Sequence, residues 1–223
     1  MGISTGVLDG LWGDWPALVM RACKTATHAV EMSALSGAEL PSLIAYLRSA
    51  PRLPFRYVSV HAPAKAFGEA DVARLAEIPL SIRSIVAHPD TITDFAPYRA
   101  VGNRLVLENM DGRKPTGRTA DELADYFDCL PAAGFCFDIA HAYSLDPTLE
   151  LAHDLLDRFR TRLRQVHLSS LDVLGRHIPL TASDEEMFAP VLDRCRDVPW
   201  ILEAEPPRRW AAQLRSPALR LVS

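Results

Sequence analysis

The sequence predicts a single (β/α)8 barrel, the TIM barrel fold, with residues 1–223 forming one domain. Short apolar segments with strand character recur along the chain, and amphipathic helical segments lie between several of them. Strands that alternate with helices indicate a parallel sheet. The 223 residues also match the size of one small barrel. A doubly wound open sheet is the alternative, but no glycine-rich phosphate loop follows the first segment to support it.

Eight segments have the near-continuous apolar character of strands that are buried on both faces. In chain order they are Gly2–Thr5, Ala29–Ser33, Tyr57–His61, Ser84–His88, Arg104–Glu108, Gly134–Asp138, Arg164–Leu168 and Pro199–Glu203. Eight strands of this kind close most naturally into a barrel.

Helical segments with apolar residues at positions i, i+3 and i+4 lie between these strands. They include residues Ala38–Ser49, Asp71–Ala76, Thr119–Leu130 and Leu149–Leu163. Thr119 with Glu122 three residues later resembles a capping box, which places a helix start at Thr119.

The composition narrows the classes of partner and location. No apolar run approaches the roughly 18–20 residues that span a bilayer, so we expect no membrane partner. The net charge of −4 disfavours nucleic acid as a partner. Four scattered cysteines without CxxC spacing are typical of reduced thiols, and the first residues lack the pattern of a secretion signal. We therefore expect a cytoplasmic protein, and its oligomeric state stays open.

Polar residues end most of the predicted strands. A further carboxylate, Glu31, lies within the second strand, and the residues at strand ends are His61, His88, Glu108, Asp138, His167 and Glu203. Each one alone would be explained by a scaffold hydrogen bond or a helix cap. In a barrel, however, the carboxyl ends of the strands meet at one rim. Carboxylates gathered there would repel one another and lose solvation, and a divalent cation removes both costs. The sequence therefore predicts a divalent metal site.

The donor types limit the choice of metal. Imidazole and carboxylate donors without thiolate suit Zn, Mn, Fe or Co better than Ca. We expect one to three ions per chain and no organic cofactor. His141 lies three positions after Asp138, so the turn after the strand can return it to the rim as a ligand, a substrate contact or an acid/base. His177, beside Arg176, is a similar candidate on a later loop.

Four segments, LVLEN, FDIAH, HLSS and ILEAE, resemble the xylose-isomerase-like TIM-barrel superfamily in order and spacing. This superfamily includes sugar and sugar-phosphate isomerases and epimerases, related dehydratases and endonuclease IV. The resemblance covers essentially the whole chain. In the isomerase branch it implies one metal held by Glu108, Asp138, His167 and Glu203. The two glutamates would also act as the acid/base pair, and His141 would bind substrate.

The endonuclease IV branch implies additional metal ligands. His61 and His88 would form a second site that shares Glu108, and His141 would belong to a third. That third site also uses an Asp-x-His pair, but this chain has Gly175, Arg176 and His177 there, and the spacing of Asp172 is wrong.

The resemblance therefore favours an isomerase or epimerase of a small sugar, sugar phosphate or related hydroxy-carbonyl compound. A phosphoester hydrolase with two or three metals is the alternative. Dehydration, iron-dependent oxidation and a non-catalytic metal-binding module also stay open.

We expect a small-molecule substrate that contacts residues around the metal site. Besides His141, the candidate contacts are His177, Arg176, Glu205 and Asn109. Glu205 is placed there because a residue two positions after Glu203 lies on the same side of an extended strand. The loop cations Lys65, Arg113 and Lys114 either receive a phosphate or carboxylate group or stay solvated.

Overall fold

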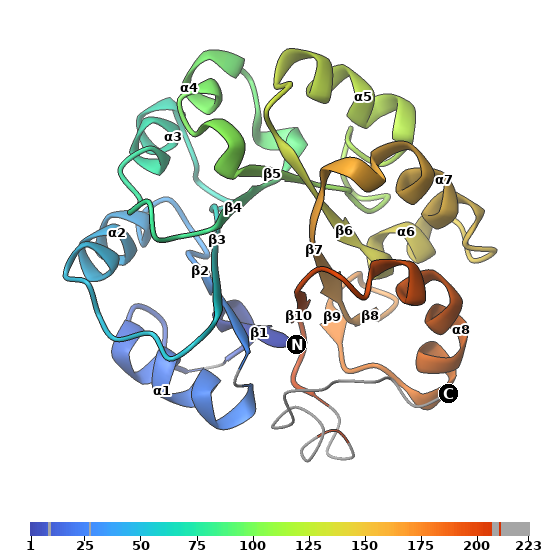
Figure 1. Ribbon diagram of the computed structural model, residues 1–223, viewed down its shortest axis with the longest axis horizontal. Helices are drawn as coiled ribbons and strands as arrows, with labels where there is room; N and C mark the ends of the chain where they lie inside the picture. The colour runs from blue at the N-terminus through green and yellow to red at the C-terminus, as the bar shows by residue number, and fades with distance from the viewer. Residues whose placement is uncertain (9, 27, 207–209, 211–223) are drawn as a thin grey trace.

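The computed structural model describes residues 1–8, 10–26, 28–206 and 210. Within them, eight parallel strands close into a barrel in the order β1-β10-β7-β6-β5-β4-β3-β2 (Figure 1). These strands are β1 (Gly2–Ser4), β2 (Ala29–Ser33), β3 (Tyr57–His61), β4 (Ser84–Ala87), β5 (Leu105–Glu108), β6 (Gly134–Asp138), β7 (Leu163–Leu168) and β10 (Trp200–Leu202). The predicted TIM barrel is confirmed. The last residues of the predicted 1–223 domain lie outside the described part of the chain.

Helices form the outer layer of the barrel (Figure 1). They are α1 (Trp15–Thr25), α2 (Leu40–Arg48), α3 (Glu69–Leu75), α4 (Phe95–Arg99), α5 (Ala120–Cys129), α6 (Ile139–Leu145), α7 (Glu150–Phe159) and α8 (Ala182–Leu192). The helix predicted over Leu149–Leu163 is too long. Helix α7 ends at Phe159, and a 3-10 turn over Arg160–Arg162 leads directly into β7.

Side-chain caps fix the start of several helices. The hydroxyl of Thr119 accepts a hydrogen bond from the backbone N–H of Glu122, as predicted for α5. The carboxylate of Glu122 binds the backbone and guanidinium of Arg118 rather than returning to the cap. Asp138 caps α6 by accepting a hydrogen bond from the N–H of His141 at 2.8 Å. The same aspartate therefore ends β6 and starts the next helix.

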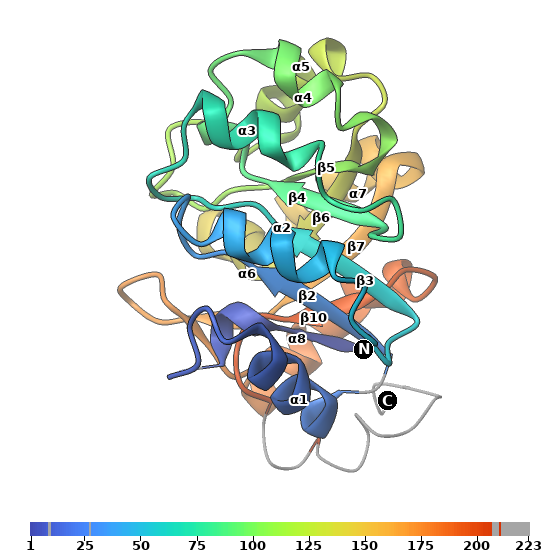
Figure 2. The same ribbon diagram turned by 90° about the vertical axis from the view of Figure 1, so that its left-hand side faces the viewer.

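A hairpin that the sequence did not predict follows β7. Strands β8 (Ser170–Leu171) and β9 (His177–Ile178) pair antiparallel outside the barrel. Figure 2 shows this hairpin as the orange loop that projects at the left of the molecule. It places His177 beside the carboxyl ends of the strands.

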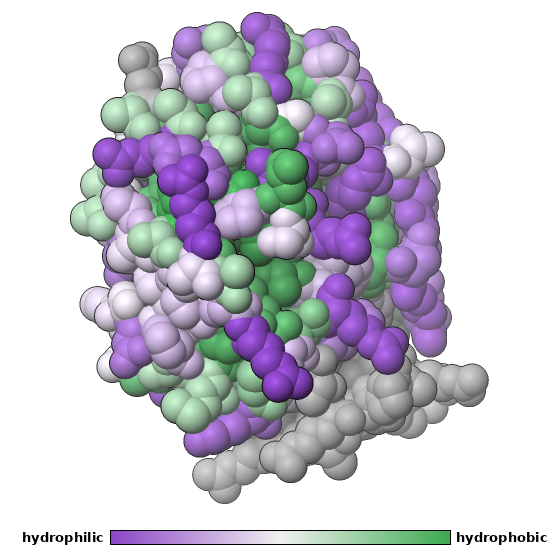
Figure 3. Space-filling view, turned by 60° about the vertical axis from the view of Figure 1, so that its left-hand side comes forward, coloured by the Kyte–Doolittle hydropathy of each residue, from purple (hydrophilic) through white to green (hydrophobic). Residues whose placement is uncertain are grey.

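The apolar core lies mostly between the strands and the helices. One large cluster includes Ile3, Leu43, Leu107 and Phe137, all fully buried. On the flank seen in Figure 3, hydrophilic side chains are spread among apolar ones, as expected for helices with one outward polar face. None of the helices in the described residues is long and apolar enough to cross a membrane.

Candidate metal centre

The carboxyl ends of the strands surround a cavity of about 580 Å³. The residues predicted at these ends come together there with His141 from helix α6 and His177 from strand β9. Those that line the cavity are His61, His88, Glu108, His141, His177 and Glu203. Asp138 and His167 lie directly beside them and are fully buried. The register of β6 and β7 pairs Asp138 with His167, so the two side chains lie at the same level of the barrel.

Glu108 lies at the centre of the cluster. Its Oε2 is 3.2 Å from Nε2 of His61 and 3.2 Å from Nε2 of His88, and its Oε1 is 2.9 Å from Nδ1 of His167. Burial opposes ionisation of this carboxyl group, but the three histidines outweigh it and hold the pKa of Glu108 well below its usual range. Burial also opposes a charged His61, yet the hydrogen bond to Glu108 helps raise the pKa of His61 to about 9. The carboxylate is therefore ionised and accepts contacts from three sides.

Asp138 is a fully buried carboxylate, and within the described part of the chain only one of its two oxygens has a hydrogen bond. Its Oδ1 caps helix α6, whereas its Oδ2 is buried without a hydrogen-bond partner among the described residues. Burial, helped by the nearby charge of Glu203, raises the pKa of Asp138 to about 6. A bound cation would neutralise this oxygen, so the donor set fits a divalent metal.

His141, in helix α6, and His177, in strand β9, lie beside Asp138 and Glu203. Nδ1 of His141 is 3.6 Å from Oδ2 of Asp138, and Nδ1 of His177 is 3.4 Å from Oε2 of Glu203. The rings of His141 and His177 are 5.3 Å apart between centroids. Ser169 holds His177 by a 2.7 Å hydrogen bond to Nδ1.

Ligand atoms within 4.8 Å of one another define four overlapping groups among the described residues. They are His61, His88 and Glu108; Glu108, Asp138, His167 and Glu203; Asp138, His141 and His177; and Glu31, His61, His167 and Glu203. Glu108 joins the first two groups, and Asp138 joins the second and third. Asp138 is the carboxylate grouped with His141 and His177, whereas Asp172 binds Arg176.

Three predicted substrate contacts lie elsewhere. Arg176 binds Asp172 at the hairpin loop, and its side chain is 72% exposed. Glu205 pairs with Arg21 at 2.9 Å on the surface. The prediction that Glu205 shares a side with Glu203 is wrong, because β10 ends at Leu202 and strand alternation stops there. Asn109 is fully buried, and its amide bonds the backbone of Asp138.

The loop cations differ in their pairing. Lys114 binds Asp90 at 2.9 Å, and Arg113 binds Asp111 and the carbonyl of Leu174. Lys65 lines the cavity. Of the cations that the sequence placed near the rim, Arg113 and Lys114 are therefore already neutralised by carboxylates.

Sequence reasoning did not find Gln165 or the contacts of Glu31. Both are fully buried, and both approach Nε2 of His167 from inside the barrel. The signal in the sequence that could have identified them is a polar residue, Glu31 or Gln165, within an otherwise apolar strand.

Comparisons with known proteins agree with the barrel fold. A family model described as xylose isomerase-like TIM barrel matches residues 55–220. The structure is similar to endonuclease IV from Thermus thermophilus, with 21% identity, a TM-score of 0.58, and coverage of 94% of this chain and 93% of that chain. It is also similar to a protein from Anabaena variabilis described as a putative sugar phosphate isomerase/epimerase. There the identity is 13%, the TM-score 0.54, and the coverage 98% and 88%. A search of curated proteins gave no match.

Proposed function

The chain belongs to the xylose isomerase-like TIM barrel family, and from this premise we propose that it is a metal-dependent hydrolase of small phosphoesters with more than one divalent cation. The observation that carries the proposal is that histidines approach both carboxylate oxygens of Glu108. His61 and His88 both approach Oε2, while His167 approaches Oε1. Glu108 would therefore help to hold two cations, one with His61 and His88 and one with His167.

Three of the four groups of ligand atoms could each hold one cation. His61, His88 and Glu108 would hold one, and Glu108, Asp138, His167 and Glu203 a second. Asp138 with His141 and His177 offers a third position. When bound, such cations supply Lewis acidity and lower the pKa of water.

The side chains supply the positioning and the proton transfer. Glu203 is only 12% exposed and turns one oxygen to His167 and the other to His177, so it can accept a proton from water held at the cavity floor. Lys65 at the cavity wall adds positive charge for a phosphate group. The cavity volume of about 580 Å³ suits a small molecule.

An isomerase or epimerase is the second candidate. The observation that favours it is the approach of both Glu108 and Glu203 to Nδ1 of His167, at 2.9 and 3.2 Å. Two glutamates on one ligand group match the acid/base pair that such a proton transfer needs. In that case His61 and His88 would serve as substrate contacts or scaffold.

Elemental analysis of protein purified without chelator or affinity-tag metal tests the proposal first. Two or three cations per chain, with phosphate release from small aryl and sugar phosphoesters, would support the hydrolase. One cation per chain, with solvent deuterium entering ketoses or ketose phosphates, would favour the isomerase instead. Glu205→Gln serves as the matched control, because its carboxylate lies outside the cluster. Absence of metal even after reconstitution would overturn both.

A further inference from the structure

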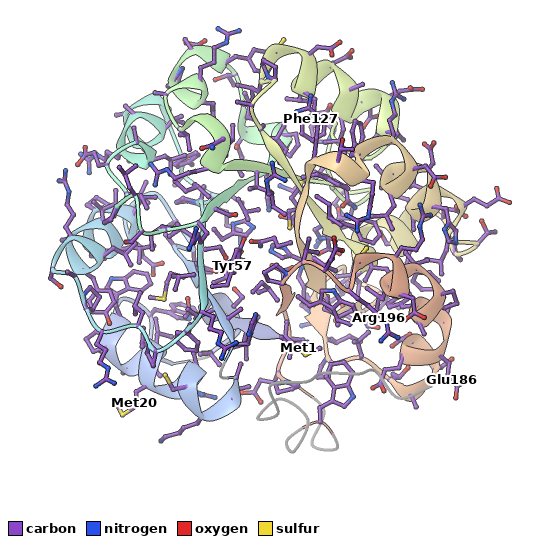
Figure 4. All side chains as sticks on the ribbon, viewed as in Figure 1. Met1, Met20, Tyr57, Phe127, Glu186 and Arg196 are labelled. Atoms are coloured by element: carbon purple, nitrogen blue, oxygen red, sulfur yellow. The ribbon has the colours of Figure 1, made fainter. Side chains whose placement is uncertain are left out.

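A buried polar network lies inside the barrel beneath the metal centre. Tyr57 points into the barrel interior (Figure 4), where its hydroxyl contacts Ser84 at 2.7 Å and Gln165 at 2.8 Å. Gln165 continues the network to Glu31 at 2.7 Å. Interiors of such barrels are usually filled with branched apolar side chains. Polar groups in this position therefore require an explanation other than packing.

Glu31 is the charged member of this network. Its Oε2 accepts hydrogen bonds from Ser59 at 3.0 Å and from Gln165, and it lies 3.3 Å from Nε2 of His167. Its Oε1 is buried without a hydrogen-bond partner among the described residues. A buried carboxylate costs free energy unless another group uses its charge.

The two ring nitrogens of His167 face different surroundings. Nδ1 faces the metal centre, 2.9 Å from Glu108 and 3.2 Å from Glu203. Nε2 faces Glu31 and Gln165 in the barrel interior. A cation held with Glu108 and Glu203 would use the lone pair of Nδ1, so the ring proton would sit on Nε2.

We propose that Glu31 is a positioning residue that accepts the Nε2–H of His167 and aims Nδ1 at the cation. A carboxylate behind a ligating histidine fixes the ring orientation and strengthens the other nitrogen as a ligand. The amide of Gln165, 2.8 Å from Nε2, can only donate a proton there. It therefore suits the other ring form, in which Nδ1–H donates to Glu108. Gln165 therefore donates a hydrogen bond to Nε2 in the metal-free protein, and Glu31 accepts one from Nε2–H in the metal-bound protein.

This inference rests on the metal centre of the proposed function but not on the reaction. Glu31 also shares a possible ligand group with His61, His167 and Glu203. Direct ligation is the competing role. Ligation through Oε2 would compete with Ser59 and Gln165, which already donate to that oxygen.

The experiment compares Glu31→Gln with Ser59→Ala in metal affinity. Glutamine keeps the size of the side chain but replaces the charged acceptor with a neutral one. Ser59→Ala removes a hydrogen bond to the same Glu31 oxygen and spares His167. Chelator competition with Zn²⁺ and elemental analysis give affinity and stoichiometry. We expect Glu31→Gln to bind Zn²⁺ about 10–100-fold more weakly with unchanged stoichiometry at saturation. Ser59→Ala should stay close to the wild type.

Nitrogen-15 NMR of the wild-type imidazoles provides a readout that needs no variant to fold. We expect His167 to carry its proton on Nε2 in the Zn²⁺-loaded protein and on Nδ1 in the metal-free protein at a pH where the ring is neutral.

Equal affinities of Glu31→Gln and the wild type, or Nδ1–H in the loaded protein, would overturn the inference. Loss of one whole metal equivalent would show that Glu31 is a ligand instead. A wild type that binds metal without phosphoester turnover would overturn only the proposed function, whereas one that binds no metal would overturn both.

Discussion

Asn109 and Asp138 exchange two hydrogen bonds across neighbouring strands. The amide nitrogen of Asn109 donates to the carbonyl of Asp138, and the backbone N–H of Asp138 donates to the amide oxygen, both at 2.8 Å. Both residues are fully buried. The pair fixes the end of β6 against the end of β5 and thereby sets the position of the Asp138 carboxylate.

Asn109→Ala should therefore lower stability rather than substrate affinity alone. The substitution leaves a buried N–H and a buried carbonyl unpaired, so we expect the free energy of unfolding to fall by about 2–4 kcal/mol. Urea unfolding of the metal-free protein measures this change. A variant that is as stable as the wild type but has a raised KM would instead support the prediction that Asn109 contacts substrate.

Metal removal should also lower stability. The buried carboxylates Glu108, Asp138 and Glu203 repel one another without a cation, and a ligand bound only by the folded state adds stability by mass action. At 100 times its dissociation constant, a metal would add about 2.7 kcal/mol. Thermal unfolding before and after dialysis against EDTA tests this. An unchanged melting temperature, with metal confirmed in the starting sample, would contradict a site of this kind.

His88→Gln should reduce the metal content by about one equivalent per chain. His88 belongs to the ligand group of His61 and Glu108 and to no other of the four groups. The group that contains Asp138, His167 and Glu203 keeps all its donors in this variant. Elemental analysis of the variant beside the wild type measures the difference. Full retention of metal would assign His88 to the substrate or to the scaffold.

The metal-free protein should show a pH dependence that originates at Asp138. Burial raises the pKa of this carboxyl group to about 6, above the value of about 3.9 in an unfolded chain. Between these values the folded state holds a proton that the unfolded state has lost. The contribution of Asp138 to stability is therefore full below about pH 4 and falls as the pH rises to about 6.

Asp138→Asn isolates this effect, because asparagine can still cap helix α6 through its side-chain oxygen but does not ionise. We expect the variant to gain stability relative to the wild type as the pH rises from 4 to 6, by on the order of 3 kcal/mol. Chemical unfolding of both metal-free proteins at several pH values measures the difference. A difference that stays constant with pH would show that Asp138 titrates normally.

Glu203→Gln should separate catalysis from metal binding. Its side chain lines the cavity, and the proposed function assigns the proton transfer to it. We expect kcat to fall by roughly 10²–10⁴-fold, the usual contribution of an acid/base group, with most of the metal retained through the remaining ligands. Steady-state kinetics and elemental analysis on the same preparation test this. Wild-type turnover in the variant would assign the proton transfer to another residue.

The positions of the strands could be predicted from the sequence. Each barrel strand lies within one residue of its predicted ends, and those beginning at Ala29, Tyr57 and Gly134 match at both ends. Apolar runs bounded by polar residues are local signals, so they can be recognised without knowledge of the fold. The β8–β9 hairpin was missed because its strands are two residues long and carry no such pattern.

The sequence by itself determined the barrel and the convergence of His61, His88, Glu108, Asp138 and Glu203 at one rim. Those conclusions need only strand order and strand ends, which parallel topology brings to the same side. Tertiary structure alone decided which atoms meet. Two histidines contact one oxygen of Glu108, and Asp138 lies in the third ligand group. Glu31 lies behind His167, and Glu205 pairs with Arg21 outside the cavity. Contacts across a closed barrel depend on register, tilt and the exact end of each strand, and no local pattern in the chain encodes them.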